Sequence, residues 1–253
     1  NYQIQEMAPI QCTYRGYTVL SAPPPSSGGV TLCEMLAILE HFPLRQMGYR
    51  STASTRVIIE AMRFAFMDRN KKLGDPDFVK NPIDELLSPT YINQLSKQIR
   101  LHDQGKPITN NSFHELTDTT HYSVVDKEGN AVAVTYTLNG FFGSRLIAPP
   151  TGFFLNDEID DFTIVAGQAN KFGLTQSDAN LIAPGKRPLS SMAPTIIMKD
   201  GKLFMVLGSP GGPRIITSIL LTIINVIDYG MSIQQAVNAP RYHFQSSPDS
   251  IDL

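Results

Sequence analysis

The sequence predicts an α+β protein whose helices and strands are segregated instead of alternating. Apolar residues recur at helical spacing over 51–73, and β-branched segments separated by turn residues follow the middle of the chain. A helical pattern returns at 215–227. Strands framed by helices without a regular β-α repeat argue for a layered α+β domain and against a doubly wound sheet.

Three helices are predicted in the first part of the chain. A loop rich in proline, serine and glycine at 22–29 leads into an apolar helix over 30–39. The amphipathic pattern at 51–73 predicts a long second helix that begins at a serine cap. The third is predicted over 88–99, because Ser88 precedes a proline at the first helical position.

A polar, unperiodic segment from about residue 101 to 118 separates a helix-rich part from a strand-rich part. We therefore expect two units, 1–118 and 119–253, joined by a mobile linker. In the second unit, turn residues split apolar segments into two predicted hairpins, and two helices follow. These elements are 122–125 with 131–138, 194–199 with 202–207, and the helices 215–227 and 232–238.

Composition excludes several classes of function. The 253 residues carry 21 Lys and Arg against 23 Asp and Glu, so the formal charge of −2 provides no cationic field for nucleic acid. The longest apolar stretch, 215–227, is shorter than the roughly 20 residues that cross a bilayer. The first nine residues lack the basic start and apolar run of a secretory signal.

The two cysteines, Cys12 and Cys33, are 21 positions apart and form no C-x-x-C pair. Their spacing predicts neither a zinc cage nor a redox pair, although it leaves a single disulfide open. Two free thiols are favoured, since Cys33 falls on the apolar face of a predicted helix, where cysteine acts as a small hydrophobic residue.

No cofactor or metal site is predicted. The sequence lacks G-x-S-x-G, S-x-x-K, G-x-x-x-x-G-K and G-x-G-x-x-G. His114 and Glu115 begin like the zinc motif H-E-x-x-H, but Asp118 stands where the second histidine belongs. The five histidines form no i,i+4 pair, so they are interpreted as surface or structural residues.

Hydroxyl- and glycine-rich blocks stand out in the second half, and each alone has an ordinary explanation in strand propensity or turn formation. Their order and spacing, with those of further blocks, closely resemble the γ-glutamyltranspeptidase family of N-terminal nucleophile hydrolases. The matching blocks are P-P-P-S-S-G-G at 23–29, L-G-D-P-D-F at 73–78, T-T-H-Y-S-V at 119–124, V-T-Y-T-L-N at 134–139, D-D-F at 160–162, R-P-L-S-S-M at 187–192, G-S-P-G-G at 208–212 and D-Y-G at 228–230.

The resemblance implies the αββα layers of that superfamily and a threonine nucleophile. Thr119 is expected to attack the carbonyl of Asp118, so that autoproteolysis releases residues 1–118 as one subunit. Cleavage is needed because the nitrogen of Thr119 is a non-basic amide in the uncut chain, whereas a free α-amine has a pKa near 7.7–8.0 and can act as the base.

The family pattern also assigns roles around the nucleophile. Thr137 is expected to hydrogen-bond the nucleophile region. The backbone N–H groups of Gly211 and Gly212 are expected to form the oxyanion hole, where glycine permits a close approach of the backbone.

A second set is expected to bind the glutamyl end of the substrate. By resemblance, Asp161 holds its α-ammonium group with the help of Asn139 and Glu158. Ser190 and Ser191 hold its α-carboxylate, alongside an arginine that family members supply from a region corresponding to chain before residue 1. Such a zwitterion requires a pocket with groups of both signs.

Residues 163–180 correspond to the lid that covers this pocket in the family. Phe172 stands where some members have a tyrosine that bridges to the position of Asn139. Because phenylalanine has no hydroxyl donor, we expect lid closure that is looser or depends on packing.

The expected substrates are glutathione and other γ-glutamyl compounds, with amino acids or peptides as acceptors. Two alternatives stay open: a related acylase or poly-γ-glutamate hydrolase, and a non-catalytic, unprocessed fragment. The second is serious because family members extend further at both ends, so the fold is expected to be incomplete and the isolated chain weakly active or inactive. By resemblance alone, the location is periplasmic or extracellular.

Overall fold

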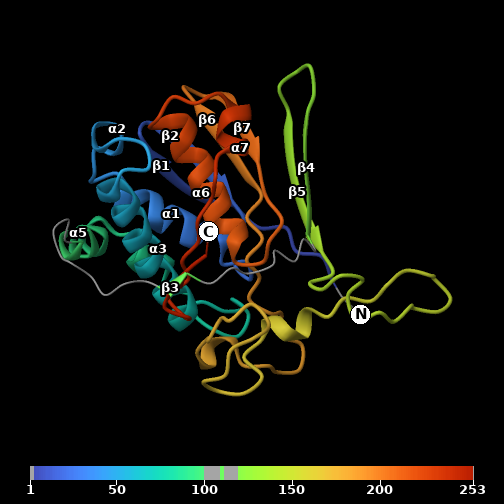
Figure 1. Cartoon of the computed structure of the whole chain (residues 1–253). Coiled ribbons are helices and arrows are strands. Elements are labelled where there is room, and N and C mark those ends of the chain that lie inside the picture. The colour runs from blue at the N-terminus through green and yellow to red at the C-terminus, as the bar shows by residue number, and fades with distance from the viewer. Residues whose placement is uncertain (1–2, 100–108, 111–118, 253) are drawn as a thin grey trace.

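A computed structural model describes residues 3–99, 109–110 and 119–252. Within these ranges the chain forms three layers: a group of helices, a four-stranded antiparallel sheet, and a long two-stranded hairpin (Figure 1). The α+β class predicted from the sequence is confirmed. None of the described helices is long and apolar enough to cross a membrane.

The four-stranded sheet joins the two ends of the chain, in the order β1-β2-β6-β7. Its second pair of strands was predicted from the sequence, whereas the first pair was not. Each pairing is antiparallel, and β2 pairs with β6 from Thr18 opposite Met198 to Ser21 opposite Thr195. The strands are β1 (Ile10–Tyr14), β2 (Tyr17–Ser21), β6 (Thr195–Lys199) and β7 (Lys202–Leu207).

The five predicted helices begin and end close to the predicted positions, and two further short helices, 44–47 and 83–86, were not predicted. Ser51 and Ser88 cap their helices by accepting hydrogen bonds from the backbone N–H groups of Ser54 and Tyr91, as expected of serine caps. The helices are α1 (Gly28–Leu39), α2 (Leu44–Met47), α3 (Thr52–Lys72), α4 (Ile83–Leu86), α5 (Pro89–Gln98), α6 (Arg214–Ile227) and α7 (Ile233–Asn238).

The hydrophobic core lies between the sheet and the helices. Helix α1 contacts β1, β2, α3, α5 and α6, and nearly all of its residues are buried. Val19 and Ile197 face this layer from the sheet and are fully buried. Helices from both predicted units therefore cover one face of the sheet.

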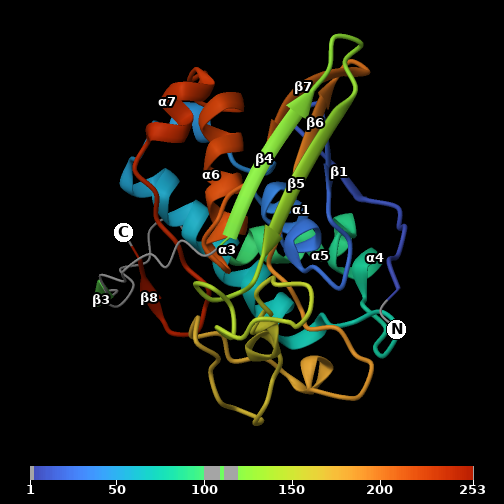
Figure 2. The ribbon, with the colours of Figure 1, turned by 90° about the vertical axis from the view of Figure 1, so that its right-hand side faces the viewer.

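The hairpin β4 (Thr119–Val125) and β5 (Ala131–Thr137) lies along the other side of the sheet, against β6 and β7 (Figure 2). Strand β4 starts three residues before the predicted strand. The ring of His121 meets the backbone directly after β7, at Gly208, where a β-carbon would lie 2.1 Å from His121 Nδ1. Glycine thus permits the close approach of the hairpin.

The remaining described elements are short. Strands β3 (Thr109–Asn110) and β8 (Ser250–Ile251) pair in parallel. Two 3-10 turns, η1 (Glu158–Asp161) and η2 (Asp178–Asn180), lie in the long segment that links β5 to β6.

The prediction of two free thiols is wrong. Cys12 in β1 and Cys33 in α1 form a disulfide, with their Cα atoms 5.9 Å apart. Cys33 is buried on the apolar face of α1 as expected, but that face packs directly on β1 and brings the two sulfurs together.

The boundary predicted at residue 118 falls outside the described residues, and the division into two units stays a prediction. The two stretches are nevertheless interleaved, because β1 and β2 come from the first and β6 and β7 from the second. The helix-rich part thus also supplies half of the main sheet.

Candidate active site

Thr119 and Thr137 lie opposite each other in the ladder of β4 and β5. The Thr119 hydroxyl donates a hydrogen bond to Thr137 Oγ1 at 3.2 Å, and the backbone N–H of Asn139 donates to the same oxygen at 2.9 Å. Because side chains of directly opposed residues point to the same face, the hairpin register alone brings the two threonines together. Asp118, the other residue of the predicted cleavage site, lies outside the described residues.

Asn139 turns the chain away from the end of β5. Its backbone is left-handed, with φ 70°, a conformation that asparagine tolerates better than most residues. The side-chain amide is buried and donates to the Asp157 carbonyl at 3.2 Å. The acidic segment that starts at Asp157 is thereby held beside the two threonines.

Glu158 and Asp161 lie at the two ends of η1, and their carboxyl groups are hydrogen-bonded to each other. Burial and the charge of Asp161 raise the pKa of Glu158 well above its usual range. Burial also raises the pKa of Asp161, and the positive charge of Arg69 opposes that shift. The hydrogen bond between the two carboxyls raises the pKa of Glu158 and lowers that of Asp161, so it favours the proton on Glu158 and the charge on Asp161.

Ser190 and Ser191 are held by the loop at 23–29. The Ser190 carbonyl accepts hydrogen bonds from Ser27 N–H at 2.8 Å and from Ser27 Oγ at 2.7 Å. A β-carbon on Gly28 would lie 2.5 Å from the Met192 carbonyl oxygen, so only glycine allows this contact. This gives Ser27 and Gly28 of the motif at 23–29 a role beside the site, which the sequence alone did not indicate.

Arg69 is a member of this cluster that sequence reasoning missed. It is buried on α3 and donates to Ser191 Oγ at 3.0 Å and to Ser27 Oγ at 2.9 Å. The sequence contained a signal that could have identified it. Arg69 continues the helical spacing of the apolar residues Met62, Ala65 and Phe66, and a charged residue is unusual at such a position.

Gly211 and Gly212 lie immediately before the first turn of α6. Their φ values of 120° and 55° are conformations that favour glycine. This places them at the helix N-terminus, where backbone N–H groups and the helix dipole favour negative charge. The Phe172 ring covers Gly212, since a β-carbon there would lie 2.7 Å from the ring.

Most of the predicted site residues line one narrow pocket of about 20 Å³. Glu158 does not line the pocket but is hydrogen-bonded to the lining residue Asp161. Gly211 directly precedes the lining residue Gly212. The lining residues are Thr119, Thr137, Asn139, Asp161, Phe172, Ser190, Ser191, Met192, Gly212, Pro213 and Ile215. The last two and Met192 were not predicted.

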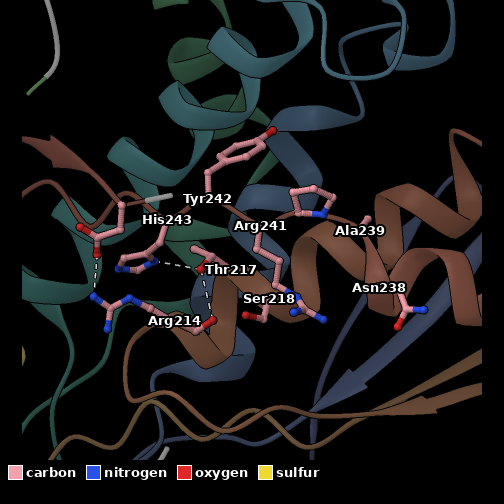
Figure 3. Close-up of a pocket in the computed structure, with 10 residues that line it drawn as sticks. Arg214, Thr217, Ser218, Asn238, Ala239, Arg241, Tyr242 and His243 are labelled. Carbon is pink, nitrogen blue, oxygen red and sulfur yellow. Dashed lines mark hydrogen bonds and ion pairs between the residues drawn. The ribbon is translucent and has the colours of Figure 1, made fainter. Parts of the chain in front are cut away.

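A larger cavity of about 370 Å³ lies along α6 and the segment after α7 (Figure 3). Its polar groups largely satisfy one another: Arg214 forms an ion pair with Asp252 at 2.8 Å, and Thr217 Oγ1 lies 2.8 Å from His243 Nδ1. Burial lowers the pKa of His243 to about 3, which keeps the ring neutral. No residue of the predicted catalytic set lines this cavity, so we place the chemistry in the smaller pocket.

The described residues contain no group of three or more His, Cys, Asp or Glu side chains arranged to hold a metal ion. The pocket instead combines a nucleophile candidate, the Asp161 carboxyl with its partner Glu158 behind it, and hydroxyl donors. It can thus attack a carbonyl carbon while binding a ligand of mixed charge.

Comparisons with known proteins agree with this arrangement. A family model described as gamma-glutamyltranspeptidase matches residues 1–253. The glutathione hydrolase proenzymes of Pseudomonas sp. (strain A14) and Escherichia coli K12 are 54% and 48% identical, over 100% and 99% of this chain. The acylase ACY 1 proenzyme of Pseudomonas sp. (strain V22) is 40% identical over 95% of it. The chain spans 44%, 44% and 41% of these relatives' lengths.

Solved structures give the same result. The T380A mutant of Helicobacter pylori gamma-glutamyltranspeptidase aligns with a TM-score of 0.51 at 57% identity, covering 52% of this chain and 71% of that one. Cephalosporin acylase from Bacillus halodurans aligns with a TM-score of 0.77 at 26% identity, covering 97% and 42%. On the match of the family model to its whole length, the chain belongs to the γ-glutamyltranspeptidase family.

Proposed function

We propose that the complete protein carrying this chain transfers or hydrolyses γ-glutamyl groups of glutathione and related compounds. The observation that carries the proposal is a single pocket lined by Thr119, Asp161, Ser190 and Ser191. A nucleophile that shares a pocket with a carboxyl group and a pair of hydroxyl donors matches a substrate whose end carries both an ammonium and a carboxylate group.

Activation begins with the peptide bond between Asp118 and Thr119. The Thr119 hydroxyl attacks the carbonyl carbon of Asp118, the peptide shifts to an ester, and water hydrolyses the ester. This leaves a carboxylate on Asp118 and a free α-amine on Thr119. Thr137, hydrogen-bonded to the nucleophile oxygen, orients the hydroxyl during this step.

In the processed enzyme, the α-amine of Thr119 accepts the hydroxyl proton as the oxygen attacks the γ-carbonyl of the substrate. The N–H groups of Gly211 and Gly212 stabilise the negative charge that develops on the carbonyl oxygen. Collapse of this intermediate breaks the γ-amide bond, and the α-amine returns the proton to the leaving amine. Water or an acceptor amine then resolves the γ-glutamyl ester.

The pocket holds the glutamyl end at two places, Asp161 and the pair Ser190 and Ser191. The Asp161 carboxylate accepts hydrogen bonds from the α-ammonium group, while Ser190 and Ser191 donate to the α-carboxylate. A pocket of about 20 Å³ has room for little more than one water and is far too small for a glutamyl group, so we expect Phe172 and its segment to move when the substrate enters. This requirement supports the role of Phe172 in a lid.

The test of activation is intact-mass spectrometry with N-terminal sequencing of the complete protein after incubation at neutral pH. We expect a new fragment that begins Thr-Thr-His-Tyr, and Thr119→Ala as the control should stay uncut. An intact, folded wild-type chain after prolonged incubation would refute the proposal. The isolated 253-residue chain, tested in parallel, shows whether it is an unprocessed fragment.

A related acylase is the second candidate, supported by the 40% identity to the acylase ACY 1 proenzyme. A glutaryl group has no ammonium for Asp161 to hold, so comparing γ-glutamyl and glutaryl anilides separates the two activities. Preference for the γ-glutamyl anilide supports γ-glutamyl chemistry, and preference for the glutaryl anilide supports an acylase.

We also propose that the protein works outside the cytoplasm, in the periplasm or the extracellular space. The disulfide between Cys12 and Cys33 supports this location, because disulfides persist in oxidising compartments. Fractionation of the source cells with an activity assay would test it.

A further inference from the structure

Arg69 is fully buried on α3, yet it does not line the pocket. Its guanidinium lies directly behind the pocket wall and has an acceptor for each of its five N–H groups. Those acceptors are Ser27 Oγ at 2.9 Å, Asn70 Oδ1 at 2.8 Å, Gln176 Oε1 at 2.9 Å, Ser191 Oγ at 3.0 Å and the Leu189 carbonyl at 3.5 Å.

All five acceptors are neutral, so none of them compensates the buried charge directly. Burial accordingly lowers the pKa of Arg69 to about 10, and the carboxylate of Asp161 acts in the opposite direction. A buried cation is costly unless it is paired, and here the group that offsets it is the acidic side of the pocket.

One bond of Arg69, from Nη2, restricts how the Ser191 hydroxyl can be oriented. A hydroxyl has one proton to donate and two lone pairs to accept with. Because Arg69 occupies a lone pair of Ser191 from behind the wall, the proton of this hydroxyl is free to point forward into the pocket. There it can donate to an anionic group.

A second bond of Arg69, from Nη1, connects it to Asp161 through Gln176. Gln176 accepts from Arg69 through Oε1, and its Nε2 donates to the backbone carbonyl of Asp161 at 3.0 Å. Asn180 donates to the same carbonyl at 2.7 Å. Arg69 is thereby connected to the end of η1 that presents Asp161.

We propose that Arg69 is a positioning residue for both ends of the pocket: it aims the Ser191 hydroxyl at the substrate carboxylate and holds Asp161 in place. The inference rests on the proposed γ-glutamyl function. In this proposal, the preference for substrates with a zwitterionic end depends on a side chain that does not touch the substrate. A purely structural Arg69 would instead affect every substrate alike.

The first experiment measures kcat and KM of the complete, processed protein with three anilides: γ-glutamyl, glutaryl without the ammonium, and 4-aminobutyryl without the carboxylate. The variant Arg69→Lys keeps the charge and loses the planar fork. Arg63→Lys, a partly exposed arginine on the same helix, is the matched control.

Arg69→Lys loses the bonds to both Ser191 and Gln176, so we expect kcat/KM to fall most, at least about tenfold and mainly through KM, for γ-glutamyl anilide, which carries both the carboxylate and the ammonium group. The glutaryl and 4-aminobutyryl anilides, which each carry one of these groups, should lose less, and Arg63→Lys should change none of the three. Equal losses on all substrates would overturn the proposal. If the wild-type enzyme cleaves no γ-glutamyl anilide, the proposed function itself fails.

The second experiment compares the acid limb of kcat/KM for wild type, Arg69→Lys and Arg69→Met. The charged groups that act on Asp161 and its partner Glu158 are Arg69, Lys171, Asp157 and Asp160. Removing the Arg69 charge raises the pKa of Asp161, so the limb should move to higher pH in Arg69→Met and stay in place in Arg69→Lys. A limb that moves in neither variant would contradict the proposal.

Gln176→Leu provides a variant that retains Arg69 if Arg69→Met does not fold. It breaks the connection to the Asp161 carbonyl and leaves the bond to Ser191 intact. We expect KM to rise for the two substrates with an ammonium group and to be unchanged for the glutaryl anilide. A uniform effect on all three would count against the positioning role.

Discussion

Burial, a second carboxyl group and a buried arginine all act on the pKa of Asp161. Burial favours the protonated acid, whereas Arg69 and the hydrogen bond from Glu158 favour the carboxylate. Because the pKa is raised overall, the carboxylate is lost at a higher pH than for an ordinary aspartate. Binding of an ammonium group should therefore weaken as the pH falls through this raised value.

Replacing Asp161 by asparagine tests its role as the ammonium site. Asp161→Asn should lower kcat/KM for γ-glutamyl anilide about 10- to 100-fold, mostly through KM, since a charge-assisted hydrogen bond is lost. Steady-state kinetics measures the effect, with the exposed Asp178→Asn as the control. An unchanged KM would rule out this role.

Substitutions of Glu158 test the shared proton. An amide can still donate to Asp161, so Glu158→Gln should keep kcat/KM within about twofold of wild type near pH 6. Glu158→Ala removes the donor, raises the pKa of Asp161 and should move the acid limb to higher pH. Identical pH profiles for the alanine variant and wild type would show that the two carboxyls act independently.

A substitution of Phe172 tests the proposed lid. Its ring lies against Gly212 and lines the same pocket as Asn139, so a hydroxyl added in Phe172→Tyr could donate to the groups at the pocket mouth. We expect a lower KM for γ-glutamyl substrates with little change in kcat. A KM equal to that of wild type would count against a closing role.

At the scale of elements, the site depends on contacts between segments far apart in the sequence. The loop at 23–29 holds Ser190, α3 supplies Arg69, and the N-terminus of α6 supplies the glycines. The disulfide attaches β1 to α1, the helix that this loop leads into. Its loss should act on folding more than on chemistry.

Cys12→Ala with Cys33→Ala should lower the free energy of unfolding by about 3 kcal/mol, as expected for a loop of this length. Urea unfolding of the complete protein measures the change. Dithiothreitol should destabilise wild type by a similar amount and leave the double variant unaffected. Equal stability of the two proteins in oxidising buffer would refute a stabilising disulfide.

At the scale of the whole molecule, the predicted cleavage site separates segments that remain in one sheet. Strand β2 pairs with β6 along four residue pairs, and α1 packs on α6 in the same core. Cutting the chain before Thr119 removes one covalent bond and none of these contacts. The two fragments should therefore stay together as subunits.

Size-exclusion chromatography of the processed protein tests this expectation. Fragments that end at Asp118 and begin at Thr119 should elute together under native conditions and separate only in denaturant. Thr119→Ala should elute at the same volume as a single chain. Separation of the fragments in native buffer would contradict the shared sheet.

The sequence by itself determined the five longest helices, the two later hairpins, and most of the residues that line the pocket. Periodicity and capping are local, and the ordered motif blocks carry the family resemblance, so neither needs the fold to be known. The pairing of β2 with β6, the disulfide and the place of Arg69 were decided only by the tertiary structure. Each depends on which distant segments come into contact. The role of Arg69 in particular follows from its hydrogen-bond partners, and these come from segments far away in the sequence.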